Sequence, residues 1–270
     1  LGFSVGTDHP SVEWSERAAA ARKTKGPDGF AAKEPLVTIG AVPPYLASRT
    51  VVTFAGGFKR KHGAFNCGDL SAVNNSNHFG FVEQGVVFSR LNPGVATVEI
   101  RQDGAVDLLT WPQDGATRFP FILHARQNGP ALIQGVDADG VSIPGPLVNR
   151  RYEGAWSSNV DGHMLTIRVG LGVQETQTGR RFLILAYFTG ATPNAMARVF
   201  QAYGVRYAMG LDMNSPALCY AALYGRDDQG KIVKTEYLHT AMATANGTRN
   251  GLRFVGSNDL RDCFYVLRKS

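Results

Sequence analysis

An acid, an amide and a hydroxyl stand close together after an apolar run, at Asp212, Asn214 and Ser215. A carboxylate at the exit of a buried strand can act as a general acid or base, or can orient a bound substrate. Amide and hydroxyl groups hydrogen-bond sugars and phosphates. The same residue types are also typical of a turn whose side chains cap the following backbone. Both interpretations, a site and a turn, stay open at this point.

Other residues have the chemistry to hold an anion. Gly56 and Gly57 would let backbone N–H groups approach one, or would form a bulge in a strand. Arg150 and Arg151 could supply a guanidinium clamp for phosphate or carboxylate, or could be surface charges. Neighbouring strand residues face opposite sides, so we expect at most one of the two arginines in a site. His239 is interpreted first as a structural histidine and second as a catalytic one.

Glycoside cleavage needs a second carboxylate beside the acid, or a group that replaces it. Glu153, Asp161 and Glu175 are candidates, and their spacing does not select among them. Asn66 and Asp69 follow the Gly-Gly segment at loop distance and are further polar candidates.

Several chemistries have no motif in the chain. The six histidines are scattered, with no HExxH pattern, and the cysteines at 67, 219 and 263 form no CxxC pair, so no metal site is predicted. Gly170-Leu171-Gly172 lacks the third glycine of a dinucleotide loop, and neither a P-loop nor a G-x-S-x-G elbow occurs. We expect no cofactor.

The charge balance is mildly basic, with 28 basic and 22 acidic residues and a net charge of +6. This excess suits an anionic ligand, or serves solubility alone. A nucleic-acid partner is not expected, because the best basic run is the short stretch 59–62. No apolar run reaches the roughly 18 residues of a membrane span. Since the chain begins with Leu1 rather than Met, we expect a processed or trimmed protein.

The elements that must position these groups are mostly strands. Residues 11–23 predict a short helix and 23–33 a linker, so that 1–33 form an N-terminal helix and linker and 34–270 a single domain. From residue 35, β-branched and aromatic runs punctuated by glycine predict strands. The expected class is α+β: strand-rich mixed sheets with a few helices packed on them.

One βαβ-like unit is predicted around residues 182–212. Thr192 is a natural N-cap, Pro193 fits the first helical position and Gly204 fits the position after the helix. One apolar face recurs at helical spacing between them, at Met196, Val199, Phe200 and Tyr203. The unit places Asp212 at the exit of its second strand, where ligands bind in sheets flanked by helices.

Three segments, in order, resemble the phosphodiester glycosidase family. The first is Thr53–Phe58 (TFAGGF), similar to the family's strand that runs into N-G-G-F-F, and the second is Asn128–Ile133 (NGPALI), similar to G-P-x-L. The third is the predicted helix followed by Gly204-Val205 and by Leu211–Ser215 (LDMNS), similar to a strand ending in L-D-G-G-G-S. The resemblance covers roughly residues 50 to 225.

The resemblance implies a secreted, periplasmic or cell-envelope hydrolase that cleaves a glycoside or sugar-phosphodiester in an extracytoplasmic glycan. Asp212 would be the acid/base or the substrate-orienting carboxylate, with Arg150 or Arg151 and backbone amides holding the anion. The implied partner is a carbohydrate or sugar phosphate, and the implied binding residues are Gly56, Gly57, Phe58, Asn66, Asn128, Asn214, Ser215 and His239. Met213 and Asn214 stand where the family has glycines. The alternative is therefore a glycan-binding or structural domain without the chemistry.

Overall fold

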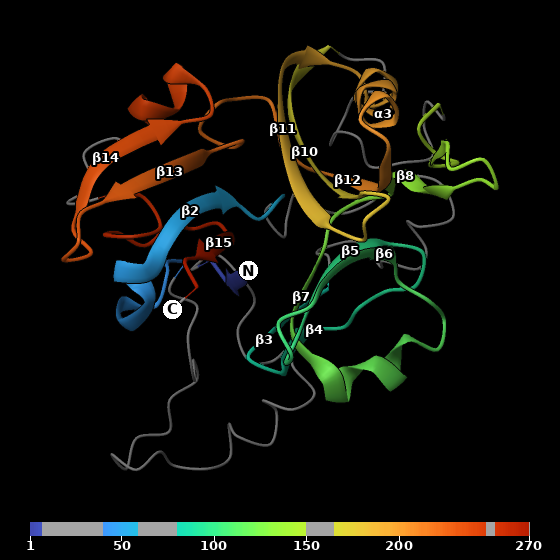
Figure 1. The fold of residues 1–270 in the computed structure, drawn as a ribbon. Helices are drawn as coiled ribbons and strands as arrows, with labels where there is room; N and C mark the ends of the chain where they lie inside the picture. The colour runs from blue at the N-terminus through green and yellow to red at the C-terminus, as the bar shows by residue number, and fades with distance from the viewer. Residues whose placement is uncertain (7–39, 59–79, 150–164, 247–251, 270) are drawn as a thin grey trace.

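The computed structural model describes residues 1–6, 40–58, 80–149, 165–246 and 252–269. Across these ranges the chain forms fifteen strands in three sheets of five strands each (Figure 1). Every pairing within the sheets is antiparallel. The predicted helix at 11–23 and linker at 23–33 lie outside the described residues.

The first sheet joins the two ends of the described chain. Its strands, in spatial order, are β1 (Gly2–Ser4), β15 (Cys263–Leu267), β2 (Thr50–Ala55), β13 (Ala221–Arg226) and β14 (Ile232–Tyr237). The 3-10 helix η2 (Pro44–Arg49) comes directly before β2, and the 3-10 helix η5 (Thr240–Asn246) follows β14 in the sequence. Phe54 and Phe264 stack across β2 and β15 with ring centroids 5.2 Å apart.

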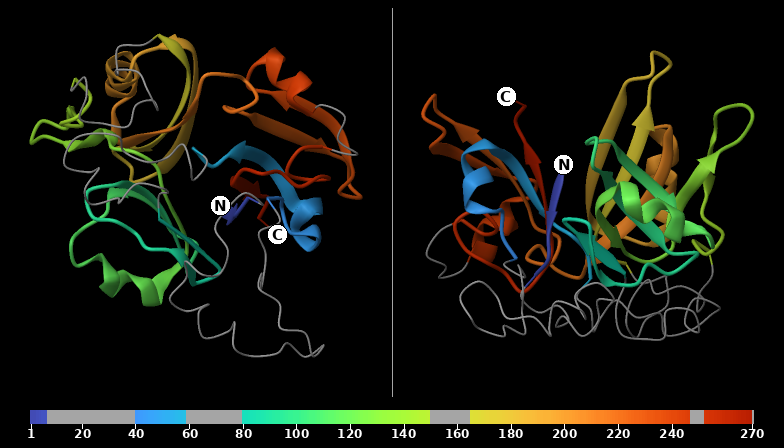
Figure 2. Two further views of the ribbon diagram at one scale, coloured as in Figure 1. Left: turned by 180° about the vertical axis from the view of Figure 1, so that it is seen from behind. Right: turned by 90° about the horizontal axis from the view of Figure 1, so that it is seen from below.

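The second and third sheets are built between β2 and β13 in the sequence. The second sheet has the order β11 (Arg181–Ala191), β10 (Thr166–Glu175), β12 (Val205–Met213), β8 (Ala131–Val136) and β9 (Ser142–Pro144). The third has the order β4 (Val86–Ser89), β3 (Phe81–Glu83), β7 (Ile122–Gln127), β5 (Ala96–Arg101) and β6 (Val106–Thr110), with the 3-10 helix η4 (Gly115–Phe121) after β6. Seen from below, the first sheet stands opposite the other two (Figure 2).

The α-helix α3 (Pro193–Ala202) packs on the second sheet over a strip of glycines. Thr192 caps the helix by accepting a hydrogen bond from the Ala195 amide at 3.2 Å. A Cβ atom at Gly170 would lie 2.9 Å from side-chain atoms of Met196 and Phe200. The missing side chain therefore lets the apolar face of the helix approach the sheet closely.

The predicted α+β class with mixed sheets is wrong. The described residues form antiparallel sheets, with α3 as their α-helix. The segments β11, α3 and β12 do follow one another, but β10 lies between the two strands and pairs antiparallel with both. The pairing of β10 with β11 joins consecutive strands through a short turn, whereas the pairing of β10 with β12 joins strands separated by β11 and α3, which local sequence patterns do not report.

Candidate functional site

Asp212 lies in a β-bulge near the end of β12. Arg168 of β10 faces Met213, and Gly170 faces Gly210, so two steps along β10 match three steps along β12. The extra residue breaks the alternation of side chains, and bulges of this kind redirect a side chain beside a site. The Asp212 side chain is buried, with the residue 4% exposed.

Two groups hold the Asp212 carboxylate. Oδ1 accepts a hydrogen bond from the Met213 amide at 2.8 Å, and Oδ2 forms an ion pair with the Arg261 guanidinium. Burial raises the pKa of Asp212 to about 6, while the positive charge of Arg261 opposes that rise. The same Arg261 nitrogen also lies 3.4 Å from the Gly57 carbonyl oxygen, so Arg261 brings Gly57 and Asp212 together.

Asn128 clamps the bulge to the turn after β2. Its Oδ1 accepts a hydrogen bond from the Phe58 amide at 3.0 Å, and its Nδ2 donates to the carbonyl oxygens of Gly210 and Leu211 at 2.7 and 2.6 Å. Gly57 has a φ of +134°, and a Cβ there would lie 2.5 Å from Asn128 Oδ1. Glycine is therefore required by both the backbone conformation and the close approach.

A second buried ion pair, between Arg126 and Asp262, also holds the turn after β2. Arg126 Nε donates to Asp262 Oδ2 at 2.6 Å, and Arg126 Nη2 donates to the Phe58 carbonyl oxygen at 2.6 Å. Asp262 also accepts the Gly6 amide at 2.9 Å, and its backbone carbonyl accepts the Gly56 amide at 2.8 Å. The Gly56 amide therefore donates its hydrogen bond within the protein.

Arg168 is the functional candidate that the sequence reasoning missed. The residue is 3% exposed, its Nε donates to the Ala191 carbonyl at 2.8 Å, and its Nη1 lies 3.5 Å from Met213 Sδ. Burial lowers the pKa of this guanidinium to about 10. An arginine in the otherwise apolar run 166–173 was the available signal, because a charge inside a buried strand is rare without a role.

Asp212 and Arg168 line one small cavity of about 20 Å³, which we call the Asp212 cavity. Its other described lining residues are Phe58, Asn128, Gly129, Leu132, Val169, Met196, Gly210, Leu211 and Met213. Of the buried charged residues described above, Arg168 and Asp212 line this cavity, Arg261 pairs with Asp212, and Arg126 pairs with Asp262.

The polar residues after Asp212 build a turn. Asn214 has a left-handed backbone with a φ of +79°, and its Oδ1 accepts a hydrogen bond from Thr166 Oγ1 at 3.1 Å. The Ser215 hydroxyl oxygen accepts the Leu218 amide at 3.3 Å. Cys219 Sγ donates to the Asp212 carbonyl at 3.3 Å, and burial raises the thiol pKa. The proposed contacts of Asn214 and Ser215 with a ligand stay predictions.

His239 lies apart from the Asp212 cavity lining. Its Nδ1 accepts the Ala241 amide at 3.2 Å, and its ring packs on Tyr187 with centroids 5.1 Å apart. Glu175 pairs with Arg206 and also lies outside that lining. The remaining predicted candidates, Arg150, Arg151, Asn66, Asp69, Glu153 and Asp161, fall outside the described residues.

Within the described ranges, no cluster of three or more histidine, cysteine, aspartate or glutamate side chains could hold a metal ion. The described helices include none with the length and apolar character to cross a membrane.

Comparison with known proteins finds a likeness among solved structures. No family model matches the sequence, and no curated protein matches it. Among solved structures, the chain is similar to the zebrafish N-acetylglucosamine-1-phosphodiester alpha-N-acetylglucosaminidase catalytic domain auto-inhibited by its pro-peptide. The identity is 12% and the TM-score 0.46, over 83% of this chain and 66% of that chain. The resemblance predicted from the sequence is therefore confirmed as a distant one.

Proposed function

We propose that the chain is a secreted or cell-envelope hydrolase that removes a sugar from a phosphate, or cleaves another glycosidic bond, in an extracytoplasmic glycan. The observation that carries the proposal is that Asp212 and Arg168 both line one cavity. A carboxylate suits sugar hydroxyls or a proton transfer, and a guanidinium suits phosphate oxygens.

The roles follow from the chemistry of the bond. Hydrolysis adds water across the bond between the anomeric carbon and the oxygen: the hydroxyl goes to the sugar and the proton to the phosphate. In the proposal, Arg168 stabilises the charge that develops on the leaving phosphate, as preorganised donors do. Asp212 orients the sugar or exchanges the proton, for which a pKa of about 6 is well matched near neutral pH.

A specific observation favours the second candidate, a glycan-binding or structural domain without chemistry. Asp212 is already engaged by Arg261 and by the Met213 amide, and the Met213 thioether lies against Arg168. The Asp212 cavity of about 20 Å³ is close to the volume that one water needs, roughly 10–15 Å³. A substrate would have to displace these contacts before it reached the two charged groups.

A panel of chromogenic sugar phosphodiesters and neutral glycosides separates the two candidates. If the chain is a hydrolase, Arg168→Gln lowers kcat/KM on the phosphodiesters by about 100-fold or more, in line with the loss of one charge-stabilising donor. The loss of kcat/KM on neutral glycosides is expected to be smaller, because their leaving group carries no phosphate charge. Asp212→Asn is expected to lower turnover on both classes.

Glu175→Gln is the matched control, since it also neutralises a carboxylate paired with an arginine, but outside the Asp212 cavity. Circular dichroism checks that each variant is folded. Saturable glycan binding with no turnover of any panel member would support the second candidate and reject the hydrolase.

A further inference from the structure

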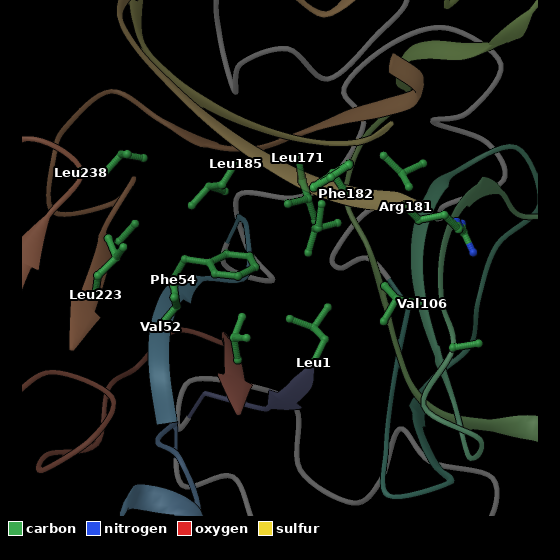
Figure 3. Close-up of a pocket in the computed structure, with 15 residues that line it drawn as sticks. Leu1, Val52, Phe54, Val106, Leu171, Arg181, Phe182, Leu185, Leu223 and Leu238 are labelled. Carbon is green, nitrogen blue, oxygen red and sulfur yellow. The ribbon is translucent and has the colours of Figure 1, made fainter. Parts of the chain in front are cut away.

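A large apolar pocket lies between the first sheet and the other two (Figure 3). Its volume is about 680 Å³, which is within the range of small-molecule sites, roughly 300 to 1,000 Å³. The pocket and the Asp212 cavity share no described lining residue. The pocket is therefore a second concave site with its own chemistry.

The walls of the apolar pocket come from all three sheets. Figure 3 shows Val52 and Phe54 of β2 facing Leu171 of β10 and Leu185 of β11, with Val106 of β6 at one side. The other described lining residues are Leu1, Ala105, Val173, Arg181, Phe182, Leu183, Ala221, Leu223, Leu238 and Val266. An aliphatic ligand would find dispersion contacts on several sides and few polar groups to desolvate.

Large apolar side chains at this pocket remain exposed to solvent. Phe182, Leu223 and Leu238 are 41%, 42% and 41% exposed. Exposed apolar side chains around a concavity are typical of a ligand-binding groove. Covering them would supply a hydrophobic driving force for binding.

One end of the pocket carries positive charge. Arg181 is the charged side chain of its described lining, and it pairs with Asp107 at 2.5 Å. Asp107 is shared with Arg101, and Glu99 beside it with Arg118 at 2.7 Å. These three arginines and two carboxylates leave an excess of one positive charge. Arg180 adds another, with its guanidinium carbon 5.3 Å from the Phe182 ring centre.

We propose that this pocket binds the aliphatic chain of an anionic amphiphile, whose carboxylate or phosphate head lies at Arg181. The aliphatic lining recognises the chain, and the basic end recognises the head. This binding function goes beyond the proposed hydrolase activity, since it uses none of the Asp212 cavity residues.

The test uses the full chain with decanoate and decanol, which share a chain length and differ in the charge of the head. Displacement of a fluorescent fatty acid measures the affinity of each. Decanoate is expected to bind saturably, and Arg181→Gln is expected to weaken its binding by about two- to fivefold, as for an exposed ion pair. The affinity for decanol is expected to stay unchanged in that variant.

Leu223→Trp fills the pocket from β13 and is expected to weaken both ligands at least about tenfold, because the chain site itself is lost. Val233→Trp is its matched control: it lies on the neighbouring strand β14, is exposed and does not line the pocket. Ala105→Phe fills the pocket from the third sheet and replaces Leu223→Trp if that variant fails to fold.

Three outcomes would overturn the proposal. The first is no saturable displacement by decanoate in the unmodified protein. The second is an equal loss of affinity in Val233→Trp and Leu223→Trp. The third is a dimer in sedimentation experiments that Leu223→Trp dissociates, which would mean that a second copy of the chain covers the pocket. Each outcome is independent of whether the Asp212 cavity catalyses hydrolysis.

Discussion

The buried carboxylate of Asp212 is paired with one arginine side chain, that of Arg261. Arg261 neutralises it from a loop that precedes β15, and the Met213 amide occupies the other oxygen. A buried pair of this kind is weak evidence of stability by itself, because desolvation opposes the attraction. Breaking it from one side is different, since one charge is left behind without compensation.

Arg261→Met is therefore expected to lower the free energy of unfolding by about 3–5 kcal/mol. The variant also removes the influence that opposes the raised pKa of Asp212, so that pKa is expected to rise further above 6. Urea denaturation measures the stability, and carboxyl NMR titration measures the pKa. The double variant with Asp212→Asn is expected to recover part of the loss.

Lys234→Met is the control for this experiment, because Lys234 and Glu236 form an exposed pair on β14. An exposed pair contributes about 0–1 kcal/mol, so the control is expected to stay near the unmodified stability. Equal losses in Arg261→Met and Lys234→Met would contradict the special role of the buried pair.

At the scale of elements, α3 is the one α-helix of the described chain and covers the glycine strip of β10. Thr192→Ala removes its N-cap acceptor and is expected to lower the free energy of unfolding by about 1 kcal/mol. Thr192→Ser keeps a hydroxyl oxygen at the same place and is expected to retain most of the stability. Thermal and urea denaturation compare the three proteins. A loss in Thr192→Ser as large as in Thr192→Ala would show that the methyl group, and not the cap, matters.

The helix was predictable because its signals are local: a cap, a proline and apolar residues at helical spacing over residues 192–204. Of the predicted apolar face, Met196 and Phe200 are buried, whereas Val199 and Tyr203 are exposed. Pairs of consecutive strands such as β10 and β11 were predictable from the short turn between them, but the pairing of β10 with β12 was not, because β11 and α3 separate these two strands in the sequence. Asp212 was expected at a strand exit, and it lies on β12 one residue before its end. The bulge that aims it depends on the register between two strands, which composition does not encode.

The residues around Asp212 also show which parts of the site could not be predicted from the sequence. Arg261 and Arg126 are far from Asp212 in sequence and carry no motif of their own. Asn128 was found through the resemblance, yet its side chain clamps backbone on both sides rather than facing free space. The only sequence signal for Arg168 was its charge within an apolar run.

At the scale of the whole molecule, the packing of the first sheet on the third buries a glutamate. Glu83 of β3 is 3% exposed, and its Oε2 has no hydrogen-bond partner in the described structure. Burial raises the pKa of Glu83 to about 9, with the Asp262 charge adding to the rise. The folded protein therefore holds a proton that the unfolded chain releases near pH 4.5.

This raised pKa contributes stability that is complete at low pH and is lost as pH rises toward 9. Between pH 7 and 8, each pH unit is expected to lower the free energy of unfolding by about 1.4 kcal/mol through this one group. Asp212 is already ionised in that window, since its pKa is about 6, and His124 is already neutral, since burial lowers its pKa to about 4. Burial lowers the pKa of the Leu1 amino group from 8.0, which acts against the slope, so the contribution of Glu83 is read from the variant below.

Glu83→Gln is expected to flatten this slope, because an amide has no proton to lose in the window. Urea denaturation at pH 7.0, 7.5 and 8.0 measures the slope for both proteins. Asp103→Asn, at an exposed hairpin turn, is the control and is expected to leave the slope unchanged. Parallel slopes for the unmodified protein and Glu83→Gln would contradict the assignment.

Residues that contact one another around Asp212 lie far apart in the sequence. They are therefore synthesised at different times. Asp212 meets Arg261 49 positions later in the chain, and the Gly6 amide meets the Asp262 carboxylate after 256 positions. During synthesis on the ribosome, every strand of the second and third sheets emerges before the residues that neutralise Asp212 and close β1 against β15. A nascent chain that has reached residue 213 but not residue 261 holds every strand of the second and third sheets, and its Asp212 carboxylate still lacks the Arg261 guanidinium.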